Sequence, residues 1–299
     1  MKRKTSTQSL YVVLMLMAGA AYGVVTPLVK LGITHGVPVT WLTLAQYPVS
    51  LLLFQIGRTG AGPRARPHLQ DYLAMAAVGA FGAGVSLTYY HSLAFLPGSV
   101  GIVLLFQFTW ILPLLSGLFH RHWPNRAQRY GILIVLAGTV MAGGIRGWIF
   151  PLPGILLGLA SAVLYALSLL LSGRLRPDIS PWYRAEISTA FSLALVAVAY
   201  QPWRSLHWAY DPATWIWGSL VGLFSQGIPL LLTYISAPKL PPALTGMLAS
   251  SELPVAVILS ALWLGEPVSA GRWVGVFVIL GGILFSSTVR LQARGPSIK

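Results

Sequence analysis

Long apolar runs separated by short polar breaks extend along the whole chain. A run of about 20 residues is long enough for an α-helix to cross the hydrocarbon core of a bilayer. Ten runs of this kind predict ten transmembrane helices, at 10–31, 39–57, 70–94, 99–119, 127–144, 152–173, 182–200, 214–237, 242–263 and 271–289. The connections hold at most about a dozen residues, which leaves no room for a water-soluble domain. The pattern therefore predicts an all-α, multi-pass membrane protein.

Composition supports this prediction and removes several kinds of site. The 299 residues are 56% hydrophobic and 9% charged, whereas a soluble domain has roughly 25% charged residues. The chain has no cysteine, which excludes disulfides, thiolate metal ligands and cysteine nucleophiles.

The net charge of +14 reflects topology rather than nucleic-acid binding. If the N-terminus is cytoplasmic and the predicted helices alternate in direction, only Lys30, Arg146, Arg204 and Arg272 of the 20 Lys and Arg residues fall outside. Such an excess of cations in the inner loops follows the positive-inside rule. It predicts that both termini are cytoplasmic. We also expect the protein to lie in the inner (plasma) membrane of the cell.

The two halves of the chain repeat each other. At a shift of 144 residues, Tyr90, Ser92, Leu96 and Pro97 match Tyr234, Ser236, Leu240 and Pro241, and Gly131 and Gly138 match Gly275 and Gly282. At a shift of 143, Tyr22 matches Tyr165, and Gly79, Phe81 and Gly84 match Gly222, Phe224 and Gly227. Self-similarity of this kind is the signature of a duplicated structural unit. It predicts two five-helix repeats, at 1–147 and 148–299.

An odd number of helices in each repeat requires the second repeat to cross the membrane in the opposite sense. The loop charges agree, because Arg121, Arg126 and Arg129 between the fourth and fifth runs become only Arg272, beside Glu266, in the second copy. Inverted repeats are typical of secondary transporters, whose substrate site lies near the bilayer midplane between the repeats.

Three blocks of the sequence resemble a known family. They are Gly19-Ala20-Ala21-Tyr22-Gly23, then Tyr90-His91-Ser92-Leu93-Ala94 running into Leu96-Pro97, and then Glu252-Leu253-Pro254-Val255 through Leu264-Gly265-Glu266 to Gly275–Gly282. Together they resemble the EamA-type, ten-span members of the drug/metabolite transporter superfamily. The chain departs from the family pattern where Leu253 separates Glu252 from Pro254, and in Leu118-Phe119-His120-Arg121-His122, where a Gly-Glu pair is often seen.

The resemblance implies a helical transporter of small metabolites, often an exporter of amino acids, without indicating which substrate.

Polar residues in the fourth and ninth runs are candidates for a substrate site. A charged residue inside a membrane segment is costly and is therefore a functional candidate, and Glu252 lies beside a helix-breaking proline. Ser250 and Ser251 precede it and correspond to Phe106 and Gln107 at the 144-residue shift. Gln107 lies one turn before Trp110, which is near the middle of its run. We expect Gln107, Trp110, Ser250, Ser251 and Glu252 to face a common cavity.

Two pairs of tyrosines at repeat-related positions are further candidates. Tyr90 pairs with Tyr234, and Tyr22 pairs with Tyr165. Each pair would form a wall or a gate of the cavity, although packing between helices explains buried tyrosines equally well.

The predicted function is secondary transport, the export of small metabolites by alternating access, with amino acids as the leading class. One alternative is efflux of cations or drugs, which would use an intramembrane carboxylate such as Glu252. Another is a membrane-embedded enzyme or lipid-handling protein, which would need convergent acid/base or metal-binding residues. No two of the six acidic residues are close in sequence, and there is no phosphate-binding glycine loop with a lysine.

We therefore expect no catalytic residue, cofactor or metal. The expected partners are a small-molecule substrate and membrane lipid, not nucleic acid, and the oligomeric state is left open.

Overall fold

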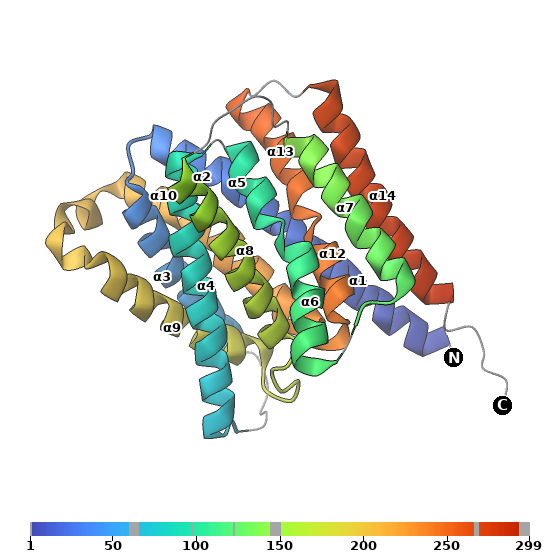
Figure 1. Ribbon diagram of the computed structural model, residues 1–299. Coiled ribbons are helices and arrows are strands. Elements are labelled where there is room, and N and C mark those ends of the chain that lie inside the picture. Colours follow the sequence, from blue (N-terminus) through green and yellow to red (C-terminus); the bar gives the residue numbers. More distant parts are fainter. Residues whose placement is uncertain are drawn as a thin grey trace.

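The computed structural model is a bundle of helices (Figure 1). It describes residues 2–59, 66–96, 98–121, 123–143, 151–265 and 269–292, and within these ranges it contains no β-strand. The helices in chain order are α1 (Lys2–Gly23), α2 (Val25–Thr34), α3 (Val39–Thr59), α4 (Leu69–Phe95), α5 (Gly98–Leu105), α6 (Phe108–His120), α7 (Arg126–Gly143), α8 (Leu152–Ser172), α9 (Pro181–Tyr200), α10 (Pro212–Gly222), α11 (Ile228–Ser236), α12 (Pro242–Ala249), α13 (Glu252–Leu264) and α14 (Ala270–Gln292). Short 3-10 turns lie at Pro202–Arg204, Leu206–Tyr210 and Ala237–Lys239, and a π-helical turn, η3, at Leu223–Gly227.

Seven helical segments among the described residues are long and apolar enough to cross a membrane. They are Ser9–Thr34, Val39–Thr59, Leu69–Phe95, Val100–Phe119, Leu152–Ser172, Pro212–Lys239 and Pro242–Leu264. Two shorter apolar helices cover Gln128–Met141 and Ala270–Gly282, in α7 and α14. Helix α9 is not among these segments and carries Arg184 and Glu186 in its first two turns.

Two of the predicted membrane runs are broken at equivalent positions. Helix α5 gives way to α6 at Phe106–Gln107, and α12 gives way to α13 at Ser250–Ser251, so that all four helix boundaries in one pair lie 144 residues from those in the other. Both α6 and α13 end in a left-handed residue, Arg121 (φ 55°) and Gly265 (φ 63°). Glycine adopts this conformation without steric cost, whereas a side chain costs about 1–2 kcal/mol.

The second break corrects the expectation that Pro254 interrupts the helix. The chain breaks before Glu252, and Pro254 lies in the first turn of α13. The first four N–H groups of a helix have no intrahelical partner, so a proline there removes no helical hydrogen bond.

Helices that begin 144 residues apart run in opposite directions. In Figure 1, α5 and α6 descend through the bundle while α12 and α13 ascend, and α7 ascends beside the descending α14. Close approach of α7 to α14 depends on glycine, because a Cβ on Gly138 would lie 2.8 Å from the carbonyl oxygen of Gly275. The first turn of α1 and the last turn of α14 lie at the same end of the bundle (Figure 1).

Helices from the two halves of the chain interleave around one large apolar core. Helix α4 packs on α8 and α9, and α3 packs on α9 and α10. Helix α1 in turn packs on α11, α12 and α13. The cavity described next lies among these contacts between halves.

Candidate functional site

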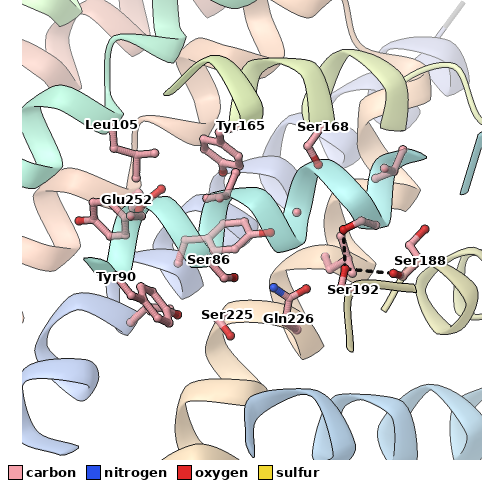
Figure 2. A pocket seen from close by; sticks show the side chains of 18 of the residues that line it. Ser86, Tyr90, Leu105, Tyr165, Ser168, Ser188, Ser192, Ser225, Gln226 and Glu252 are labelled. Carbon is pink, nitrogen blue, oxygen red and sulfur yellow. Dashed lines mark hydrogen bonds between the residues drawn. The ribbon is translucent and has the colours of Figure 1, made fainter. Parts of the chain in front are cut away.

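A cavity lies between helices of the two halves (Figure 2). Its walls come from α1, α2, α4 and α5 of the first half and from α8, α9, η3, α11 and α13 of the second. Its lining combines apolar groups with hydroxyls and one amide. The polar lining residues are Tyr22, Ser86, Tyr89, Tyr90, Tyr165, Ser168, Ser188, Ser192, Ser225, Gln226, Tyr234 and Glu252.

Glu252 is the single carboxylate among the described lining residues, and none of them is Lys, Arg or His. It begins α13 immediately after the break at Ser250–Ser251, and it is only 5% exposed. No hydrogen bond or ion pair links its side chain to any other described residue. The N-terminal end of a helix favours a negative charge by typically 0.3–1 kcal/mol, so α13 stabilises the carboxylate from its backbone side.

Two tyrosines from opposite halves meet close to Glu252. The rings of Tyr22 in α1 and Tyr165 in α8 have centroids 5.9 Å apart and stand nearly perpendicular, at 78°. Phe108 also packs against Tyr165, at 4.6 Å between centroids. The hydroxyls of Tyr165 and of the neighbouring Tyr89 are buried and have no hydrogen-bond partner in the described structure. This end of the cavity therefore holds a carboxylate, aromatic faces and unused hydroxyls.

The other tyrosine pair makes matching hydrogen bonds. The Tyr90 hydroxyl donates to Gln46 Oε1 at 3.4 Å, and the Tyr234 hydroxyl donates to Ser188 Oγ at 2.6 Å. Ser225 also donates to Gln46 Oε1, at 2.6 Å. Each tyrosine bond stays within one half, from the third to the second helical run in the first half and from the eighth to the seventh in the second, whereas the Ser225 bond joins the halves.

Hydrogen bonds from serine to glycine join the halves. Ser50 in α3 donates to the carbonyl of Gly222 at 2.9 Å, and Ser192 in α9 donates to the carbonyl of Gly79 at 2.7 Å. The glycines allow this proximity, because a Cβ on Gly79 or Gly222 would collide with a backbone carbonyl of the facing helix. Figure 2 shows Ser188 and Ser192 at the opposite end of the cavity from Glu252.

Arg184 is a buried cation within α9, only 2% exposed. Its Nη2 donates to the carbonyl oxygen of Tyr234 at 2.9 Å, and its guanidinium carbon lies 5.7 Å from the centroid of the Tyr234 ring. Arg184 does not line the cavity itself. It holds Tyr234, which does, by a charge-assisted hydrogen bond and a cation–π contact.

A salt-bridge cluster joins the two halves at one end of the bundle. It comprises Arg58, Asp71, Tyr72, Arg176, Asp178, Tyr183 and Glu186. Arg58 Nη1 lies 3.2 Å from Glu186 Oε2, Arg176 Nη1 lies 3.1 Å from Asp71 Oδ2, and the hydroxyls of Tyr72 and Tyr183 lie 2.7 Å apart.

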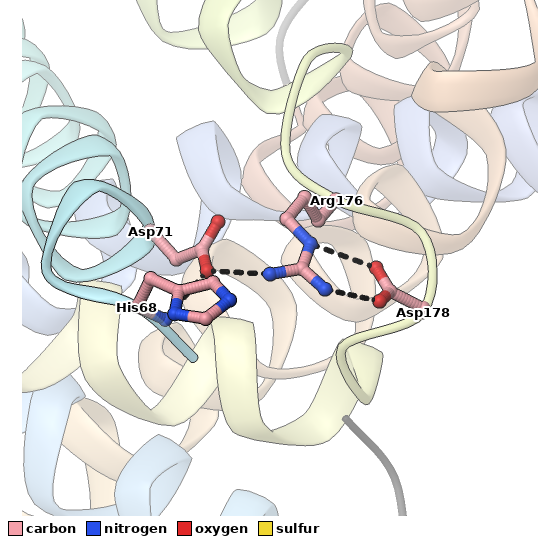
Figure 3. Close-up of polar contacts among 4 residues, drawn as sticks. All are labelled: His68, Asp71, Arg176 and Asp178. Carbon is pink, nitrogen blue, oxygen red and sulfur yellow. Dashed lines mark hydrogen bonds and ion pairs between the residues drawn. The ribbon is translucent and has the colours of Figure 1, made fainter. Parts of the chain in front are cut away.

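Arg176 bridges two carboxylates within this cluster. Figure 3 shows its guanidinium between Asp71, at the start of α4, and Asp178, in the loop before α9. The hydrogen bond from Arg176 lowers the pKa of Asp178 below its usual value and raises the pKa of Arg176. The loop is thus held to α4 by charges that persist at neutral pH.

The structure brings together five of the nine predicted site residues. Tyr22, Tyr90, Tyr165, Tyr234 and Glu252 all line the cavity, so the two repeat-related tyrosine pairs and the carboxylate share one space. Their role in substrate binding stays a prediction.

The expectation that Gln107 and Trp110 face the cavity is wrong. Neither residue lines it, and Trp110 is 40% exposed on the outside of the bundle. The Trp110 indole N–H donates to Gln107 Oε1 at 2.9 Å, and Gln107 Nε2 donates to the carbonyl of Val103 at 3.0 Å. The two side chains satisfy each other locally and need no partner in the cavity.

Ser250 and Ser251 are likewise absent from the cavity lining. Ser250 Oγ lies 3.3 Å from Thr109 Oγ1 and also donates to the carbonyl of Gly246, whereas Ser251 donates to the carbonyl of Leu16 at 2.9 Å. They hold the broken segment against α6 and α1. Glu266, predicted at a span boundary, lies outside the described residues.

Most of the hydroxyls in the lining were not predicted from the sequence. Ser86, Ser168, Ser188, Ser192, Ser225 and Gln226 reach the cavity from four different elements. Serine is common in membrane helices, where it bonds the carbonyl one turn earlier, so its presence alone carries little information. The sequence did offer one signal for Ser192: it corresponds to Ser50, as Gly222 corresponds to Gly79, at shifts within two residues of 144.

Comparisons with known proteins agree with this fold. A solved structure titled only "Crystal structure of protein" superposes on the chain with a TM-score of 0.71, covering 92% of this chain and 98% of its own, at 20% identity. At that identity the likeness shows the fold alone. No curated protein matches the chain in sequence. Residues 152–288 match the model of the EamA-like transporter family, which confirms the resemblance to the drug/metabolite transporter superfamily.

Proposed function

We propose that the protein is a secondary transporter that exports small metabolites, with amino acids as the leading class, by alternating access through the cavity. The observation that carries this proposal is the cavity itself. Its apolar walls carry a few convergent polar groups, which is the usual make-up of a small-molecule site. Tyr22, Tyr90, Tyr165, Tyr234 and Glu252 would contact the substrate.

The proposal includes ten membrane spans arranged as inverted repeats at 1–147 and 148–299. The matching helix boundaries of α5–α6 and α12–α13, and their opposite directions in Figure 1, support it. Helix α9 would be a span despite Arg184 and Glu186, because both are buried against protein rather than exposed to lipid. Helices α7 and α14 would be the fifth and tenth spans.

The bonds between halves support rocking of one repeat against the other. Ser50 with Gly222 and Ser192 with Gly79 make two equivalent contacts, as a twofold relation between repeats requires. Such contacts between closely packed helices allow rigid-body motion about a central site.

The two ends of the bundle differ in a way that suits a gate. One end carries the salt-bridge cluster, and the other carries an apolar cluster in which Val37, Trp41 and Leu42 pack against Trp208 and Trp217. An exposed ion pair contributes only about 0–1 kcal/mol, so the cluster can close one end and still open during a transport cycle. The predicted topology places the salt-bridge cluster on the cytoplasmic side of the inner membrane.

Efflux of organic cations is the second candidate function. The lone carboxylate and the absence of any cation among the described lining residues favour it. Both candidates share an amine in the substrate, and they differ in whether a carboxylate accompanies it.

Uptake of a panel of labelled amino acids into proteoliposomes, with and without a pH gradient, tests the leading proposal. We expect at least one panel member to accumulate or exchange faster than in protein-free vesicles. If none does so under either condition, the amino-acid assignment fails. Accumulation of labelled organic cations in the same vesicles would then favour the second candidate.

A further inference from the structure

The repeat symmetry of the cavity is broken at Glu252. At the 144-residue shift its counterpart is Phe108, and each begins a helix, α13 or α6, directly after the break in the run. Tyr22 and Tyr165, which are also repeat-related, meet across the halves in a perpendicular contact. The two tyrosines are thus common to both repeats, whereas the carboxylate comes from the second repeat alone.

The Phe108 ring packs against Tyr165, one of these two tyrosines. It is fully buried and packs on Tyr165 with 4.6 Å between ring centroids, and Tyr165 in turn contacts Tyr22. Tyr22 and Tyr165 line the same cavity as Glu252, and Figure 2 shows Tyr165 on the Glu252 side of it.

A carboxyl group in this position must either hold a proton or find a positive partner, and the described protein supplies no such partner. Glu252 is only 5% exposed, and its side chain makes no hydrogen bond or ion pair with any described residue. A buried charge without a partner is strongly unfavourable. A cation entering the cavity would relieve this cost, and the aromatic faces around Glu252 would add a cation–π attraction.

We infer that Glu252, Tyr22 and Tyr165 form a subsite for the protonated amino group of the substrate. This inference deepens the proposed function and rests on it. It assigns the substrate class as primary amines, with or without a carboxylate, and it excludes organic acids that lack an amine. An acid without an amine would bring a second negative charge next to Glu252, with no cationic side chain in the described lining to offset it.

The remainder of the cavity accommodates a neutral or zwitterionic body. Ser168 and Gln226 face the cavity with no protein hydrogen bond to either side chain in the described structure. They are available to donate to a substrate carboxylate or to water, so a zwitterionic amino acid fits as well as a simple amine. Val25, Val78, Val85 and Leu105 line the apolar part.

Matched sets of three ligands test the subsite. Each set shares one side chain: leucine with isoamylamine and 4-methylpentanoate, and phenylalanine with phenethylamine and 3-phenylpropionate. Binding is measured by isothermal titration on the full chain in lipid nanodiscs. We expect the amine and the amino acid of at least one set to bind, and the acid of that set to bind at least about tenfold more weakly.

Substitutions then identify the group that binds the amine. Glu252→Gln keeps the size of the side chain and removes its charge, so affinity for the amine should fall about 30-fold or more. Glu252→Asp should retain most of the affinity, and Tyr165→Leu should weaken it about threefold to tenfold through loss of the ring. The matched control is Asp211→Asn, which removes a carboxylate outside the cavity while keeping the cap of α10. This control should leave affinity unchanged.

The outcomes separate the subsite from the transport proposal. If Glu252→Gln binds the amines as wild type does, or if the acids bind as tightly as the amines, the subsite is wrong even where transport is measured. If wild type binds no amine of either set, the subsite is also wrong. If amines bind at Glu252 but no labelled amine or amino acid crosses proteoliposomes, the subsite stands and the transport proposal fails. A melting temperature within a few degrees of wild type shows that Glu252→Gln is folded.

Discussion

Tyr90 and Tyr234 lie 144 residues apart, and each donates its hydroxyl to the neighbouring helix of its own half, Tyr90 to Gln46 and Tyr234 to Ser188. The geometry is repeated, but the acceptors differ, an amide oxygen in one half and a hydroxyl in the other. The differences between equivalent positions, such as Gln46 and Ser188 or Phe108 and Glu252, give the cavity two chemically distinct ends. An asymmetric substrate would therefore bind in one orientation.

The glycine contacts between halves should be intolerant of side chains. Gly79→Leu or Gly222→Leu would place atoms against the backbone of α9 or α3, and overpacking of this kind typically costs 1–3 kcal/mol or more. We expect a clearly lower melting temperature and loss of monodisperse protein in detergent. Gly281→Ala is the control, since a Cβ there meets nothing within 4 Å. An unchanged melting temperature for both leucine variants would show that the helices do not pack this closely.

Loss of charge from the salt-bridge cluster should open its end of the bundle. Arg176→Gln removes the bridge between Asp71 and Asp178, and Arg58→Gln removes the pair with Glu186. Because the chain has no cysteine, a single Ser188→Cys variant reports access to the cavity from one side without background. We expect faster labelling of Ser188→Cys by a membrane-impermeant thiol reagent when Arg58 and Arg176 are both changed. Equal labelling rates would mean that the cluster does not close this end.

The cluster should not respond to pH in the physiological range. The hydrogen bond from Arg176 lowers the pKa of Asp178 below its usual value near 3.8, so the ionised form is favoured in the folded protein. A carboxyl group whose pKa is lowered by folding stabilises the fold at pH values above its usual pKa. This stabilisation is lost as the pH falls through the lowered pKa. The Ser188→Cys labelling rate, corrected for reagent reactivity, should therefore stay constant between pH 5 and 8 in the wild-type background. A change in the labelling rate between pH 5 and 8 would mean that another titratable group controls the closure of this end.

Tyr234 should depend on Arg184 for its position. Arg184→Gln leaves the Tyr234 carbonyl without its charged donor, and loss of a partner for a buried polar group costs about 1–3 kcal/mol. Tyr234→Phe, which keeps the ring and loses only the bond to Ser188, should cost less, about 1 kcal/mol. Both are measured as shifts in melting temperature, with the exposed Tyr130→Phe as control. A larger effect of Tyr234→Phe than of Arg184→Gln would contradict the role given to Arg184.

Apolar run length and repeat spacing predicted much of the fold, because both follow from how a chain meets a bilayer. The predicted run 242–263 coincides closely with α12 and α13, and the shift of 144 is the one that relates their boundaries to α5 and α6. The side of a helix that faces the cavity was less predictable. Trp110 appeared well placed near the middle of its run, yet it lies on the outer face with its N–H satisfied by Gln107. Packing between helices distant in sequence sets that rotation, and spacing within one helix does not.

Counterflow in proteoliposomes is a direct test of alternating access through the cavity. A carrier with a single cavity that opens alternately exchanges one substrate for another, so vesicles preloaded with unlabelled leucine or another substrate from the panel should accumulate the labelled form transiently above its outside concentration. We expect this overshoot for the wild-type chain, and its loss in Glu252→Gln. Labelled substrate that enters at the same rate with or without preloading, and only reaches the outside concentration, would contradict alternating access through this cavity.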